Sequence, residues 1–357
     1  MRFYPIPLFR IFGIQVNLDY SWFIAFILIT FTLAEYFYPY FYPGHSTLLY
    51  WVFGAISAIL LFLSVLLHEL AHSLVAIYFK IPVKQINLFI FGGVAMFEEE
   101  AHSPKEEFLI AVAGPIMSIA LGIFFFILAL LYPYNDMFNG LINYLMYVNF
   151  AIGIFNLIPA FPLDGGRILR AFLWQKKDIV TATKITANLG TFFGYFLIFL
   201  GILYFISGEF INGIWLIFLG LFLKYASNVA YKETKLSAVL SKYKVENFMT
   251  VIEPLFYNVS TDEILNFYKP FYHISYIPVI GRDGKFYLLN TLNLKPNSSV
   301  EDNLEEISCW VSPYDSLFRA YKLMNQCQLD ELPVIYKNTF LGIIKRSTIE
   351  DLIQSNA

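Results

Sequence analysis

The chain of 357 residues is 58% hydrophobic and only 14% charged. Soluble globular domains carry about a quarter charged residues, so this composition excludes an ordinary soluble enzyme and indicates a membrane protein. The net charge of −3, without any run rich in lysine and arginine, excludes a nucleic-acid partner. The two cysteines, Cys309 and Cys327, are too few for a disulfide framework or a zinc ribbon. Residues 1–12 do not have the pattern of a cleavable signal sequence.

Six apolar stretches follow the short N-terminal segment. Each is close to or above the roughly 20 residues that a helix needs to cross the hydrocarbon core. We therefore expect six transmembrane helices, at residues 19–38, 48–79, 106–132, 138–160, 185–206 and 211–227.

The distribution of basic residues predicts the orientation of these spans. The loops at 36–47, 132–139 and 207–213 contain no lysine or arginine, whereas every segment on the opposite side contains at least one. Because basic residues mark the cytoplasmic side, we expect a multi-pass protein of the cell membrane with both termini in the cytoplasm.

The second apolar stretch contains the sequence His68-Glu69-Leu70-Ala71-His72. Two histidines four apart on a helix project from one face, one turn apart, which suits two ligands of a tetrahedral Zn²⁺. Glu69 follows the first histidine, where it can accept a proton from a water molecule beside the metal. Ionisable residues inside an apolar membrane helix are usually functional. The alternative is a buried cluster of hydrogen-bonded polar side chains without a chemical role.

A third ligand is expected from Asp164, the only acidic residue between Asp136 and Asp178. Catalytic zinc sites use three protein ligands and leave one position for water. Asp164 follows Pro159 and Pro162, which prevent a regular helix. Its alternative role is to cap the helix that resumes near Arg167.

Two further segments leave their roles open. Residues 84–97 predict two strands around Gly92-Gly93, which either hold an extended substrate at a free strand edge or only pack. Ala113-Gly114-Pro115 interrupts the third span, either as a kink beside a cavity or as a structural bend.

These motifs resemble the site-2 protease family of intramembrane zinc metalloproteases. The resemblance rests on His68-Glu69-Leu70-Ala71-His72 in a membrane helix, Asn156-x-x-Pro159 and Leu163-Asp164-Gly165, and covers about residues 1–228. It implies that His68, His72 and Asp164 bind zinc and that Glu69 is the general base. It also implies that Asn156 lies near the metal and steadies the substrate carbonyl or its oxyanion.

Residues 244–357 follow a linker at 229–243 and contain two repeats, 244–294 and 297–353, with Pro278 and Pro333 in corresponding places. They resemble a tandem pair of cystathionine-β-synthase (CBS) domains, which implies an adenine nucleotide as ligand and a homodimer contact. The positions that commonly hold the ribose contain Asn290 and Asn293 in one repeat and Lys345 and Thr348 in the other. Without the acidic partner, we expect weak nucleotide binding at best.

The expected fold is a polytopic α-helical membrane protein with six transmembrane helices and a small membrane-adjacent β-hairpin or sheet, followed by a C-terminal α/β tandem CBS pair. The expected function is hydrolysis of peptide bonds within or beside transmembrane helices of substrate proteins, in regulated intramembrane proteolysis, with the CBS pair as gate or regulator. The expected partners are these substrates and the lipid bilayer. The alternatives are a CBS-regulated channel or transporter, and an inactive relative that binds membrane helices without cleaving them.

Overall fold

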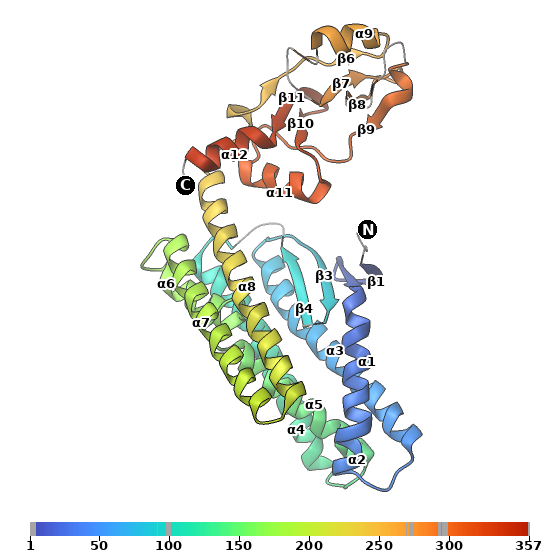
Figure 1. The fold of residues 1–357 in the computed structure, drawn as a ribbon, viewed down its shortest axis with the longest axis vertical. Helices are drawn as coiled ribbons and strands as arrows, with labels where there is room; N and C mark the ends of the chain where they lie inside the picture. The colour runs from blue at the N-terminus through green and yellow to red at the C-terminus, as the bar shows by residue number, and fades with distance from the viewer. Residues whose placement is uncertain are drawn as a thin grey trace. The chain divides into compact units, whose positions relative to one another are not determined.

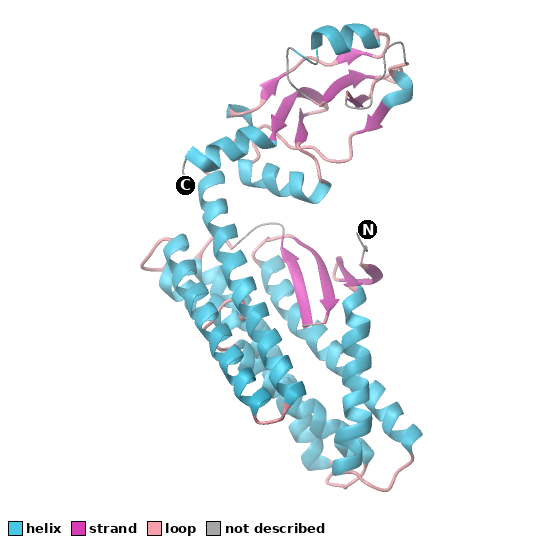
Figure 2. Cartoon of the chain, viewed as in Figure 1, coloured by secondary structure: helices cyan, strands magenta, loops and turns pink. Residues whose placement is uncertain are grey.

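The computed structural model describes residues 5–90, 92–97, 101–268, 270, 275–291, 294 and 299–355. The chain divides into two compact units, Met1–Tyr231 and Lys232–Ala357, and the division falls within one long helix, α8 (Figures 1 and 2). Residues 229–240 of the predicted linker therefore continue α8 as helix.

Six helices in the described part of the chain are long and apolar enough to cross a membrane, which confirms the predicted polytopic fold. The first, Tyr20–Phe41, combines α1 (Tyr20–Thr32), a π-helical turn (Leu33–Phe37) and α2 (Tyr38–Phe41). The others are α3 (Thr47–Tyr78), α4 (Pro104–Leu131), α5 (Met137–Asn156), α7 (Ile179–Ile206) and α8 (Phe210–Leu240). A shorter helix, α6 (Asp164–Trp174), lies between α5 and α7 in the chain.

Side-chain caps explain where several of these helices begin. Ser46, Ser103, Asp136 and Asp178 each precede a helix and accept a hydrogen bond from a backbone N–H in its first turn. Such caps satisfy backbone donors that have no partner inside the helix. After the cap at Asp178, α7 begins at Ile179, six residues before the predicted start at 185. The first turns of α7 contain polar residues, so they do not belong to the apolar stretch on which the prediction was based.

A four-stranded sheet accompanies the helices of the first unit, in the order β1 (Ile6–Ile11), β2 (Ile14–Leu18), β3 (Val83–Phe89), β4 (Gly92–Phe97). β3 and β4 form the predicted hairpin beside α3 (Figure 1), with Gly92 and Gly93 inside β4 and Phe91 outside the described residues. The sequence did not predict β1 and β2, which turn at Phe12 and Gly13 with φ of 50° and 82°. β2 pairs in parallel with β3. β4 pairs with β3 on its other side and is the last strand in the order, so it is an edge strand of the described sheet.

One face of this sheet packs on the part of α3 that carries the two histidines. Buried side chains of β2 and β3, including Val16 and Ile86, form a cluster with Leu66 and Leu70 of α3. Leu66 and Leu70 flank His68 in the sequence, so burial of the sheet fixes this stretch of α3 against β3 and β4.

The C-terminal unit contains two sheets, ordered β10-β11-β5 and β6-β7-β8-β9. Its elements are β5 (Thr250–Val251), β6 (Leu255–Phe256), α9 (Thr261–Glu263), β7 (Tyr276–Ile280), β8 (Phe286–Asn290), β9 (Leu304–Glu306), α11 (Leu317–Cys327), β10 (Glu331–Tyr336), β11 (Thr339–Lys345) and α12 (Arg346–Ser355). Pro278 and Pro333 are each the third residue of the first strand of an antiparallel hairpin. The repeat seen in the sequence therefore corresponds to two equivalent hairpins.

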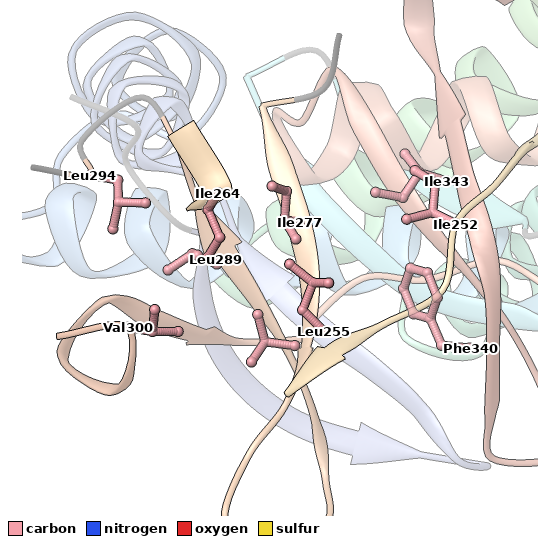
Figure 3. Packing of buried hydrophobic residues seen from close by; sticks show 10 residues of the cluster. Ile252, Leu255, Ile264, Ile277, Leu289, Leu294, Val300, Phe340 and Ile343 are labelled. Atoms are coloured by element: carbon pink, nitrogen blue, oxygen red, sulfur yellow. The ribbon is translucent and has the colours of Figure 1, made fainter. Parts of the chain in front are cut away.

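The two hairpins share a core and a buried contact. Figure 3 shows Leu255, Ile277 and Leu289 of one sheet near Phe340 and Ile343 of the other, in one buried cluster. Glu331, the first residue of β10, accepts hydrogen bonds from the N–H groups of Ser275, just before β7, and Tyr276, its first residue. Burial raises the pKa of this carboxyl group.

Cys309 and Cys327 form a disulfide in the C-terminal unit. The sequence excluded a framework of several disulfides and did not predict this single bond. Its two cysteines lie 18 residues apart in the chain and meet because α11 returns Cys327 to the segment that contains Cys309.

The predicted ribose positions lie at the ends of the hairpins. Asn290 ends β8, Lys345 ends β11, and Thr348 lies in the first turn of α12. Asn293 is outside the described residues. The expectation of weak nucleotide binding stays a prediction.

Candidate active site

The two histidines of α3 lie with their ring nitrogens close together inside the first unit. His68 and His72 are each 3% exposed, and their Nε2 atoms lie 3.2 Å apart. This geometry follows from their spacing of four residues, which places both imidazoles on one face of the helix.

Asp164 reaches the same point from a distant part of the chain. Its Oδ2 atom lies 3.1 Å from Nε2 of His68 and 3.2 Å from Nε2 of His72. A Cβ on Gly165 would overlap the carbonyl oxygen of Leu157, and one on Gly166 would lie 2.5 Å from the backbone nitrogen of Phe161. The glycine pair therefore lets α6 begin directly on the 157–163 loop, with Asp164 in its first turn and 8% exposed.

Helix α4 contacts both imidazole rings at Nδ1, the nitrogen that faces away from Asp164. Nδ1 of His72 lies 2.6 Å from the carbonyl oxygen of Ile110, and Nδ1 of His68 lies 2.8 Å from Oγ of Ser118. A carbonyl oxygen only accepts, so His72 carries its proton on Nδ1 and presents the lone pair of Nε2 to the site when the ring is neutral. Contacts of this kind commonly fix the orientation of metal-binding histidines.

Gly114 of α4 lies directly against the two rings. A Cβ at this position would overlap Nε2 of His72 and lie 2.6 Å from Nε2 of His68. Gly114 thus lets α4 approach the two imidazole rings closely. The sequence had left the role of Ala113-Gly114-Pro115 open between a kink beside a cavity and a structural bend. Pro115 lies inside the continuous helix α4.

The donor set of His68, His72 and Asp164 fits Zn²⁺. The three candidate ligand atoms all lie within 4.8 Å of one another. Ligands bound at about 2.0–2.1 Å in a tetrahedron are separated by roughly 3.3 Å, close to the distances found here. Two imidazole lone pairs and a carboxylate oxygen repel one another at this separation unless a proton or a metal cation lies between them.

Glu69 and β4 lie beside this group. A Cβ on Gly93 of β4 would lie 2.5 Å from Cγ of Glu69 and 3.2 Å from its Cδ. The edge strand therefore lies directly against the predicted general base.

A cavity of about 380 Å³ connects these groups, and its lining includes His68, Glu69, His72, Asp164, Asn156 and five residues of β4. Asn156 is the last residue of α5, and its side chain makes no hydrogen bond within the described part of the chain. All five residues singled out in the sequence thus line one cavity.

Several groups at the site were not identified from the sequence. The Ile110 carbonyl and Ser118 hydroxyl act through tertiary contact, and an isolated serine in an apolar helix carries no signal of such a role. Arg167 also lines the cavity, with its guanidinium carbon 5.7 Å from the centre of the Phe97 ring of β4.

The profile of peptidase family M50 matches residues 56–143 and 134–201. A zinc metalloprotease of Methanocaldococcus jannaschii is 33% identical over 350 residues, covering 97% of this chain and 95% of that protein. The site-2 protease structure from M. jannaschii is 35% identical, with a TM-score of 0.48 over 64% of this chain and 95% of that one. The CBS domains of a Streptococcus pneumoniae transcriptional regulator match at 14% identity and a TM-score of 0.28, over 30% of this chain and 98% of that one. The family model and the M. jannaschii relative show that the chain belongs to peptidase family M50 and is a multi-pass membrane zinc metalloprotease.

Proposed function

We propose that His68, His72 and Asp164 hold the catalytic zinc, and that the protein hydrolyses peptide bonds within or beside the transmembrane helices of its substrates. The observation that carries this proposal is the convergence of two imidazole nitrogens and one carboxylate oxygen, from α3 and α6, on one point of a cavity among membrane-capable helices.

The remaining groups of the cavity have distinct roles in this reaction. Zinc, when bound, polarises the scissile carbonyl and increases the acidity of water. Glu69 accepts a proton from the attacking water and donates it to the leaving amine. The Asn156 side-chain amide donates to the carbonyl oxygen as negative charge develops on it. Ile110 and Ser118 hold the two imidazoles in place through Nδ1.

This activity can be tested with purified protein in liposomes together with several single-span substrate proteins. We expect cleavage that stops when zinc is removed with a chelator and returns when zinc is added. A channel or transporter would instead move solute without cleavage, and an inactive relative would bind the substrates but leave them intact under all three conditions.

We propose that β4 holds the substrate as an added strand. β4 is the edge of its sheet, lines the cavity and lies against Glu69. A peptide bond is accessible to hydrolysis only where the substrate helix is unwound, and an edge strand can pair with such an extended segment.

Cysteine cross-linking distinguishes strand pairing from simple packing of the hairpin. Val94 and Met96 of β4 are 45% and 44% exposed, and Phe9 on β1 at the opposite sheet edge is 48% exposed. In a Glu69→Gln background, a cysteine at 94 or 96 is combined with single cysteines placed in turn along the substrate segment. Cross-links should form with every second substrate position, the period of a strand. A cysteine at Phe9 should not cross-link. A period of three to four residues, or equal reaction at Phe9, contradicts strand addition.

We propose that both termini are cytoplasmic, on the basis of the one-sided distribution of lysine and arginine. A disulfide in the C-terminal unit is more typical of an oxidising compartment, so the two signals disagree. The basic residues carry the proposal, because every loop agrees with the same orientation.

An impermeant thiol reagent tests this orientation. Asn135, in the loop between α4 and α5, and Lys235 on α8 are both exposed. In intact cells, a cysteine at 135 should react and one at 235 should not, whereas both should react after lysis. The parent protein provides the background from Cys309 and Cys327. Reaction at 235 alone would reverse the orientation.

We propose that the C-terminal unit regulates cleavage as a gate or a dimer contact. Its two equivalent hairpins, marked by Pro278 and Pro333, support the interpretation as a tandem CBS pair. The residues at Asn290, Lys345 and Thr348 lack the carboxylate that would accept hydrogen bonds from a ribose, so regulation by an adenine nucleotide is the less favoured form of this proposal.

A further inference from the structure

A buried ion pair outside the proposed catalytic group links α4 to α6. Glu107 in the first turn of α4 is completely buried, although carboxylates are among the groups least often buried in proteins. Its Oε1 atom accepts a hydrogen bond of 2.6 Å from Nε of Arg170 and also contacts Nη2 of the same guanidinium. The Arg170 side chain is 11% exposed.

On α4, Glu107 belongs to the buried stripe that orients the histidines. Ile110, Gly114 and Ser118 follow it at intervals of three, seven and eleven residues, which places all four on one helix face. The Ile110 carbonyl contacts His72, and the Ser118 hydroxyl contacts His68. A shift or rotation of α4 at Glu107 would therefore move the groups that hold both imidazoles.

On the other side, Arg170 belongs to the helix that begins with Asp164. Its guanidinium carbon also lies 5.0 Å from the centre of the Phe161 ring, in the loop that leads into α6. The backbone of Phe161 donates to the carbonyl oxygen of Thr186 and accepts from Oγ of Ser227. Arg170 thus ties α4 both to α6 and to the anchored loop before Asp164.

Stability alone does not account for this pair. Oε2 of Glu107 has no hydrogen-bond partner within the described residues. Burial removes both charges from water, and apolar pairs of similar volume often stabilise a fold as well or better. What the guanidinium and carboxylate provide in addition is directional contact, which fixes two helices in one register.

We propose that the Glu107–Arg170 pair is a positioning device that holds Asp164 at ligand distance from His68 and His72. Neither residue touches the reacting atoms. The pair acts by keeping the first turn of α6 opposite the stripe of α4 that orients the two imidazoles. This inference rests on the zinc ligands proposed above.

The test is the zinc affinity of full-length purified Glu107→Gln, measured by competition with a chromophoric chelator. Glutamine preserves the volume but removes the charge, and we expect affinity to fall about ten- to a hundredfold, as is typical when a group that supports a metal ligand is altered. Tyr38→Phe is the matched control. It removes another buried contact in the same unit, the 2.6 Å hydrogen bond between Tyr38 and Ser57, and should leave zinc affinity unchanged.

The double variant Glu107→Leu/Arg170→Leu separates positioning from stability. It should unfold at a denaturant concentration near that of the wild type, yet bind zinc more weakly and show an altered visible spectrum when loaded with Co²⁺. Wild-type affinity and spectrum in the double variant, or unchanged affinity in Glu107→Gln, would overturn the inference. A wild-type protein that binds no zinc would instead refute the proposed ligands.

Discussion

Glu69→Gln should keep the wild-type zinc content and lose cleavage by about a hundredfold or more. The amide has the size of the carboxylate but cannot accept the proton of the attacking water. Zinc should stay bound because Glu69 is not one of the three residues whose ligand atoms converge at the site. The measurement is the initial cleavage rate of a single-span substrate, with zinc content determined on the same preparation.

Glu35→Gln is the control for this substitution. Glu35 lies in the first membrane-capable helix and accepts a hydrogen bond from the Trp51 indole, which a glutamine oxygen can also accept. It should cleave at the normal rate. Normal cleavage by Glu69→Gln would show that another group accepts the proton.

Gly114→Ala should strongly weaken metal binding without removing a ligand. The added methyl group would overlap Nε2 of His72 and lie 2.6 Å from Nε2 of His68, so the rings must turn away or α4 must separate from α3. Either movement takes the ring nitrogens away from Asp164. We expect at least about a hundredfold loss of zinc affinity by chelator competition, at the upper end of effects seen for groups that support metal ligands.

Gly122→Ala provides a matched control on the same helix. Its Cβ would lie 2.9 Å from the ring of Phe150, a side chain that can adjust, and nothing at that position touches the histidines. Both substitutions increase helix propensity equally. Zinc affinity in Gly122→Ala should therefore be normal, and an equal loss in both variants would mean that the effect of Gly114→Ala comes from packing of α4 in general.

The sequence predicted the groups whose pattern is local. The spacing of His68 and His72 and the six apolar stretches appear in the structure as expected. Asp164 was found because it is isolated among apolar residues and prolines, although it lies 96 residues from His68 in the chain.

The sequence could not predict groups that act only through tertiary contact. The Ile110 carbonyl belongs to the backbone and has no side-chain signature, and Ser118 and Gly114 resemble other small residues of membrane helices. Glu107 is one of two adjacent glutamates, Glu106 and Glu107, of which only the second is buried. The β1–β2 hairpin was missed because its Phe12-Gly13 turn lacks the usual Asn-Gly or Asp-Gly signal.

The central claim is that two imidazoles and one carboxylate of this chain hold a catalytic zinc. X-ray absorption at the zinc edge of the purified full-length protein measures this most directly. We predict about one zinc per chain, bound only by nitrogen and oxygen atoms at about 2.0–2.1 Å, with the scattering pattern of two imidazoles. Asp164→Ala should lower the zinc content. Protein that carries no zinc, or zinc whose surroundings are unchanged in Asp164→Ala, would contradict the claim.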